Sequence, residues 1–123
     1  MSELASAQYW DAFYSKKGGR AFQYDWFADY DTVRPQLLPH VGANKSVKII
    51  EIGVGNSEVP GGLQRDGYTN ITGVDISPIV CTQMSERYPQ VRFFNSIIPH
   101  ILSCQTFLRR SLCTDLLRVC RRK

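Results

Sequence analysis

The sequence predicts an α/β fold built on a parallel sheet, and three observations support this prediction. Residues 47–50 and 91–94 are short apolar runs typical of buried strands, and residues 71–75 form a further run between them. Segments with helical signals separate these runs. Strands that alternate with helices form parallel βαβ units.

Two helices are expected before the first strand. Residues 4–16 place four aromatic side chains on a wide apolar face, which favours a helix. The second helix carries aliphatic side chains toward the core. We expect Asp25 or Asp31 to cap it, and Pro35 to kink it or mark its first turn.

Capping signals also mark the helices between the strands. Ser57 is expected to cap the helix after the first strand, with Pro60 tolerated near its start. Ser77 followed by Pro78 is expected to begin the next helix, which runs to about Arg87.

The composition is that of one soluble globular domain: 123 residues, of which 43% are hydrophobic and 21% charged. The first residues lack the features of a secretory signal, and no apolar run is long enough to cross a membrane. The four cysteines have no Cys-x-x-Cys spacing, and the two histidines do not cluster with them. We therefore expect no metal site, and free thiols in the reducing cytoplasm.

The positive charge is concentrated in the last part of the chain. From residue 97 on the net charge is +5, so residues 1–96 carry −1 of the total of +4. An apolar stripe in this segment lies opposite several arginines, as in a basic amphipathic helix. Two interpretations stay open: a solvated helix that covers exposed sheet, or a surface for an anionic membrane or an acidic partner. We expect no nucleic-acid partner.

A glycine turn and a downstream acid form the strongest functional pattern. Gly53 and Gly55 follow the first strand, where glycine allows a sharp turn and close approach to a ligand. Alone, they are equally typical of a plain structural turn. Asp75 ends the second strand twenty positions after Gly55, where a carboxylate can accept both ribose hydroxyls. Together they predict a nucleotide-type cofactor; the alternative is that Asp75 is a helix-capping or turn acid.

The spacing favours one cofactor over the others. Glu58 stands where the dinucleotide fingerprint has its third glycine, which disfavours NAD and FAD. No Gly-Lys-Ser/Thr follows, which disfavours ATP. S-adenosylmethionine has a ribose and an adenine but no phosphate, so it fits the pattern better.

Five segments carry a resemblance to a known family: residues 9–14 (YWDAFY), 24–27 (YDWF), 51–58 (EIGVGNSE), 67–68 (GY) and 74–77 (VDIS). They resemble the seven-strand S-adenosylmethionine-dependent methyltransferases. The resemblance is strongest to the subgroup that methylates lysine on translation elongation factor 1-alpha. It covers about the first three quarters of the chain.

The resemblance implies a Rossmann-like parallel sheet of the class I methyltransferase type, with N-terminal helices. Residues 1–95 would form the cofactor-binding part of the domain, and residues 96–123 a divergent basic tail ending in an amphipathic helix. The family's adenine-reading acid and fourth strand have no counterpart in this tail. We therefore expect an incomplete, N-terminal half of the fold, a truncated form with little or no activity of its own.

The resemblance also implies which residues contact S-adenosylmethionine. The expected cofactor-binding residues are Trp10, Tyr14, Trp26, Gly53, Gly55, Asp75 and Ile76. The aromatic residues would lie over the cofactor, whose sulfonium is a cation that a ring can attract; the alternative is that they belong to the core. Glu51 would lie near the methionine end or be structural. No catalytic residue is assigned.

Two functional hypotheses follow. In the first, the chain is a protein-lysine methyltransferase with elongation factor 1-alpha as its protein substrate. In the second, it is a non-catalytic cofactor-binding or interaction protein.

Overall fold

A computed structural model describes residues 6–16 and 28–96 of the chain. The expectations for Trp26 and for residues 97–123 lie outside these residues. The elements, in chain order, are α1 (Ala7–Lys16), α2 (Tyr30–Val41), β1 (Ile49–Ile52), α3 (Val59–Arg65), β2 (Ile71–Asp75), α4 (Pro78–Arg87) and β3 (Arg92–Asn95).

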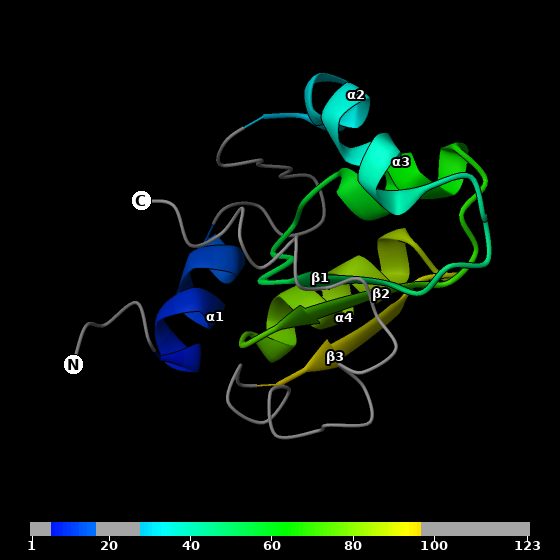
Figure 1. Cartoon of the computed structure of the whole chain (residues 1–123). Coiled ribbons are helices and arrows are strands. Elements are labelled where there is room, and N and C mark those ends of the chain that lie inside the picture. The colour runs from blue at the N-terminus through cyan, green and yellow to red at the C-terminus, as the bar shows by residue number, and fades with distance from the viewer. Residues whose placement is uncertain (1–5, 17–27, 97–123) are drawn as a thin grey trace.

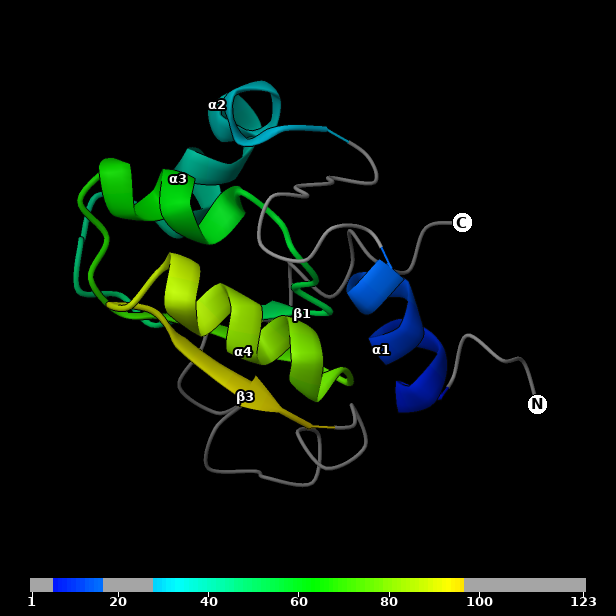
Figure 2. The same cartoon turned by 180° about the vertical axis from the view of Figure 1, so that it is seen from behind.

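The three strands form one parallel sheet in the order β1-β2-β3, which confirms the predicted α/β class. Ile49 pairs with Ile71, and Thr72 with Arg92. Opposite views of the molecule show that α4 lies against one face of the sheet (Figures 1 and 2). Because the strands are parallel, their carboxyl ends meet at one edge, and the turns that follow β1 and β2 lie there together.

The core has two main clusters. In one, Tyr30 and Val41 of α2 pack with Leu63 of α3 and with the first residues of β1 and β2. In the other, Tyr14 of α1 packs with residues of α4 and with Val54, just after β1. The first cluster anchors the amino ends of the strands, and the second joins α1 to the carboxyl ends.

Two predicted helix starts need correction. The cap of α2 is Asp29, whose side chain accepts a hydrogen bond from the Thr32 N–H; Asp31 lies in the first turn. Pro35 lies inside this helix and not at its start.

The start of α3 also differs from the prediction. Its N-cap is Glu58, which makes no side-chain capping bond. The Ser57 hydroxyl still accepts a hydrogen bond from the Val59 N–H at 3.1 Å. The predicted cap of α4 is confirmed, because the Ser77 side chain accepts from the Val80 N–H.

Candidate functional site

The glycine turn after β1 is held against the end of β2. The N–H groups of Gly53 and Val54 both donate to the carbonyl oxygen of Val74, at 2.7 and 3.0 Å. Gly53 and Gly55 have φ angles of +69° and +52°, a backbone conformation that residues other than glycine rarely adopt. The two glycines of the motif are therefore needed for this backbone path.

Asp75 points its carboxylate at the glycine turn. One oxygen, Oδ2, accepts a hydrogen bond from the Gly55 N–H at 2.8 Å, and Oδ1 accepts one from the Ser77 N–H at 2.9 Å. Asp75 is buried, and this burial raises the pKa of its carboxyl, while the hydrogen bonds from Ser77, Gly55 and Ile76 oppose the rise. A carboxylate offers about four acceptor positions, so these three backbone bonds leave room for a further donor.

The α1 aromatics lie beside the same turn. Tyr14 is buried, and its hydroxyl lies so close to Gly55 that a Cβ at Gly55 would be 2.7 Å from the hydroxyl oxygen. Trp10 stacks on Tyr14, with ring centroids 6.1 Å apart. Burial, and then the charge of Asp75, raise the pKa of Tyr14 above its ordinary value. Thus α1 brings two of the three predicted aromatics to the predicted turn.

The other predicted residues lie close by in the chain. Gly53 is exposed, and nothing lies within 4 Å of the place where its Cβ would be. Ile76 is half-buried, and its carbonyl accepts from the Asn95 side chain at 2.6 Å, which ties the end of β3 to the turn after β2. Glu51 lies within β1, as predicted.

One polar contact of this site was not predicted from the sequence. The Ser77 hydroxyl donates to Asp11 Oδ1 at 2.5 Å, and so links α1 to the start of α4. Sixty-six residues separate the two side chains, so no local pattern could reveal the pair. The only sequence signal is that each belongs to a segment that carries the resemblance.

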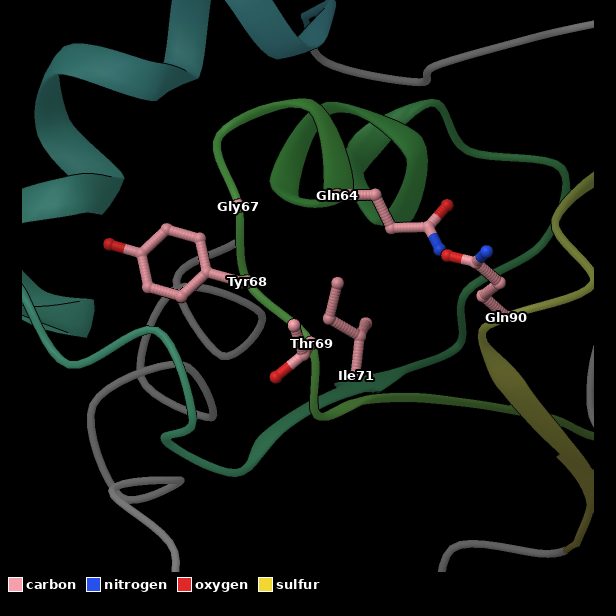
Figure 3. A pocket seen from close by; sticks show the side chains of 6 residues that line it. All are labelled: Gln64, Gly67, Tyr68, Thr69, Ile71 and Gln90. Carbon is pink, nitrogen blue, oxygen red and sulfur yellow. The ribbon is translucent and has the colours of Figure 1, made fainter.

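Two hollows lie away from the glycine turn. One, of about 130 Å³, is near the amino end of β2 and is lined by Tyr68, Ile71 and Gln90, among others (Figure 3). The other, of about 450 Å³, is bounded by residues of α4 and β3, with Cys81 and Phe93 in its wall. Neither includes Asp75 or the two glycines. We place the candidate site at the turn because Asp75 bonds to Gly55 there and both glycines have the positive φ angles that the turn requires.

The described part of the chain contains neither a metal-binding cluster nor a membrane-spanning helix. Across residues 6–16 and 28–96 no group of three potential metal-ligating side chains comes together. Within the same residues no helix has the length and apolar character needed to span a membrane. Cys81 is buried with a free thiol, and burial raises its pKa to about 11.

Comparison with known proteins gives consistent matches. No family model matches the chain. The eEF1A lysine and N-terminal methyltransferase of Danio rerio is 34% identical over 90 residues, which cover 73% of this chain and 12% of that protein. The Homo sapiens protein of the same name is 35% identical over 95 residues, 74% of this chain and 13% of its own length.

A shorter relative matches in the same way. EEF1A lysine methyltransferase 4 of Mus musculus is 37% identical over 89 residues, which cover 72% of this chain and 34% of that protein. The chain therefore spans about an eighth of the two longer relatives and about a third of this one. Over nearly three quarters of its length, this chain is therefore similar to proteins that are named eEF1A lysine methyltransferases.

Proposed function

We propose that this chain binds S-adenosylmethionine and forms the cofactor-binding part of a methyltransferase of the protein-lysine type. The observation that carries the proposal is the buried Asp75 carboxylate, which lies at the carboxyl end of β2 with Oδ2 2.8 Å from the Gly55 N–H. This is the edge of a parallel sheet at which ligands bind. The similarity to proteins named methyltransferases supports a methyl donor as the ligand.

Each part of the site has a proposed task. Asp75 accepts hydrogen bonds from the ribose hydroxyls, and Gly53 lets the backbone approach the ligand. Trp10 and Tyr14 shield the site from water and attract the cationic sulfur. Ile76 and Trp26 complete the proposed contacts, the latter from outside the described residues. When bound, S-adenosylmethionine supplies an electrophilic methyl group on its sulfonium.

The proposed acceptor is a lysine of a protein in the cytoplasm. The relatives' names point to eEF1A as that protein. A lysine must lose its proton before it attacks, and attack must be in line with the bond that breaks. We assign no catalytic residue for this step.

Calorimetric titration with S-adenosylmethionine tests the cofactor. Asp75→Ala should weaken binding by about 1–3 kcal/mol, the scale of hydrogen bonds to a charged group. Asp31→Ala is the matched control, since this exposed acid of α2 lies outside the site. Undiminished binding by Asp75→Ala, or tighter binding of NAD than of S-adenosylmethionine, would refute the assignment.

Methyl transfer is a separate measurement, because binding and transfer need different groups. Radiolabelled S-adenosylmethionine with purified eEF1A, followed by mass spectrometry of the product, would identify a methylated lysine. Label on a residue other than lysine would contradict the proposed reaction.

A further inference from the structure

Ser77 is a junction between the site and α1. Its N–H donates to Asp75 Oδ1 at 2.9 Å, and its hydroxyl donates to Asp11 Oδ1 at 2.5 Å. The same hydroxyl accepts from the Val80 N–H at 3.2 Å, and the residue is fully buried. Ser77 thus contacts the site carboxylate through its backbone and α1 through its side chain.

Asp11 reaches the first turn of α4. Besides the Ser77 hydroxyl, its Oδ1 lies 3.4 Å from the Ile79 nitrogen, which donates to it. The first N–H groups of a helix lack partners within the helix and favour a negative charge nearby. Asp11 therefore binds at the first turn of α4, where N–H groups lack partners within the helix, and it holds α1 at the carboxyl edge of the sheet (Figure 1).

The position of Asp11 on α1 matters because of its neighbours. Residues three apart lie on one face of a helix, so Asp11 and Tyr14 face the same way. The hydroxyl of Tyr14 lies against Gly55, and Trp10 stacks on the ring of Tyr14. A contact that fixes Asp11 also fixes these two rings.

We propose that Asp11 is a positioning residue of the cofactor site. Through Ser77 it holds α1 in register with α4, and this places Trp10 and Tyr14 against the glycine turn. The inference rests on the proposed function for its effect on cofactor affinity. Its structural part, the attachment of α1, is measurable without any ligand.

The first experiment measures binding of S-adenosylmethionine to three variants of the full chain. Asp11→Ala should bind about tenfold more weakly, the effect of losing a hydrogen bond to a charged group. Alanine is the best helix former, so α1 itself is not weakened. Asp11→Asn keeps an acceptor oxygen for Ser77 and should stay within about threefold of the wild type. Thr82→Ala, the control, removes an α4 hydroxyl that donates to the Pro78 carbonyl of its own helix, and should bind normally.

The second experiment needs no cofactor. Amide hydrogen exchange of Ile79 and Gly55 should quicken in Asp11→Ala and not in Asp11→Asn, while the β1 amide of Ile49, bonded to the Asn70 carbonyl, keeps its protection. A uniform loss of protection would mean a merely structural role.

Outcomes of the two experiments separate the two proposals. If the wild-type chain does not bind S-adenosylmethionine, the proposed function fails, while the exchange result still tests the attachment of α1. Wild-type affinity in Asp11→Ala would overturn the positioning role. So would an Asp11→Asn variant that binds well outside about threefold of the wild type, and this result counts even if Asp11→Ala does not fold.

Discussion

Two aspartates, one before β2 and one at its last residue, differ in their hydrogen-bond partners and in the direction of their pKa shifts. Asp66, which follows α3, accepts hydrogen bonds from side chains: one from the Tyr30 hydroxyl at 2.5 Å, and two from the Arg34 guanidinium at 2.7 and 2.9 Å. These bonds, with that of Arg34 the largest cause, lower the pKa of Asp66 to about 2.

Asp75, at the other end of the strand, takes its hydrogen bonds from backbone N–H groups of Gly55 and Ser77. Burial dominates its titration and raises its pKa, the opposite direction from Asp66. The two carboxylates are alike in chemistry but differ in their partners and in their exposure to water.

These different partners indicate different roles. Asp66 stabilises the fold, and Asp75 is placed to bind a ligand. The partners of Asp66 come from α2, so its bonds join α2 to α3. The partners of Asp75 belong to the glycine turn after β1 and to the turn after β2, so its bonds shape the edge where a ligand approaches. Changes near Asp66 should therefore lower stability, and changes at Asp75 should mainly lower affinity.

The largest expected effect is on stability, at the Asp66 end. In Gly62→Ala the new Cβ would lie 2.1 Å from the ring of Tyr30, which is fully buried. Overpacking of this kind should cost about 3 kcal/mol, measured as the free energy of unfolding in urea. Gln64→Ala in the same helix is the control and should cost much less. A Gly62→Ala chain as stable as the wild type would show that Tyr30 moves freely.

The next effect is on affinity, at the other end. In Asp75→Asn the amide NH2 replaces one acceptor oxygen, so Gly55 or Ser77 loses its acceptor. Affinity for S-adenosylmethionine should fall by about 1–3 kcal/mol, and stability by about 1 kcal/mol. Calorimetric titration and urea unfolding of one preparation measure both. A loss of stability larger than the loss of affinity would make Asp75 a structural acid like Asp66.

The sequence predicted this contrast only in part. The strands, the glycine turn and the acid twenty residues later depend on local patterns, and the structure brings Gly55 and Asp75 within hydrogen-bonding distance. The cap of α2 was mispredicted because three aspartates, Asp25, Asp29 and Asp31, lie before or at the start of that helix, and propensity does not choose among them. The contacts of Trp26 stay a prediction.

Contacts between side chains that belong to helices far apart in the chain could not be predicted from the sequence. The reason for glycine at position 62 is the ring of Tyr30, which lies thirty-two positions earlier in the chain. The link between Asp11 and Ser77 is of the same kind. Such pairs depend on how the helices pack against each other. Hydrophobic periodicity indicates which face of a helix is buried, but not which residues of another helix that face contacts.

A smaller change isolates the hydrogen bonds of Asp66. Tyr30→Phe keeps the buried ring and removes the hydroxyl that donates to Asp66. Stability should fall by about 1 kcal/mol, the net value of one such bond, with cofactor affinity unchanged. Tyr68→Phe, which removes a hydroxyl bonded to the Gly42 carbonyl, is the matched comparison. Reduced affinity in Tyr30→Phe would mean that the two ends of the sheet are coupled.

The smallest effect is the dependence of stability on pH, and it should differ in sign between the two acids. The folded pKa of Asp66, about 2, is below its ordinary 3.8, so its contribution is present above about pH 3.8 and is lost as pH falls toward 2. The folded pKa of Asp75 is raised, so its contribution is present below pH 3.8 and is lost as pH rises through the folded value.

Urea unfolding between pH 2 and 6 separates these contributions. Asp66→Asn should flatten the rise of stability with pH in the acid range, because it removes a group that gains stability there. Asp75→Asn should make stability rise more steeply, because it removes a group that loses stability as pH increases. Shifts of the same sign in both variants would show that the two carboxylates share one kind of environment, and that the division between a fold-holding and a ligand-facing acid is wrong.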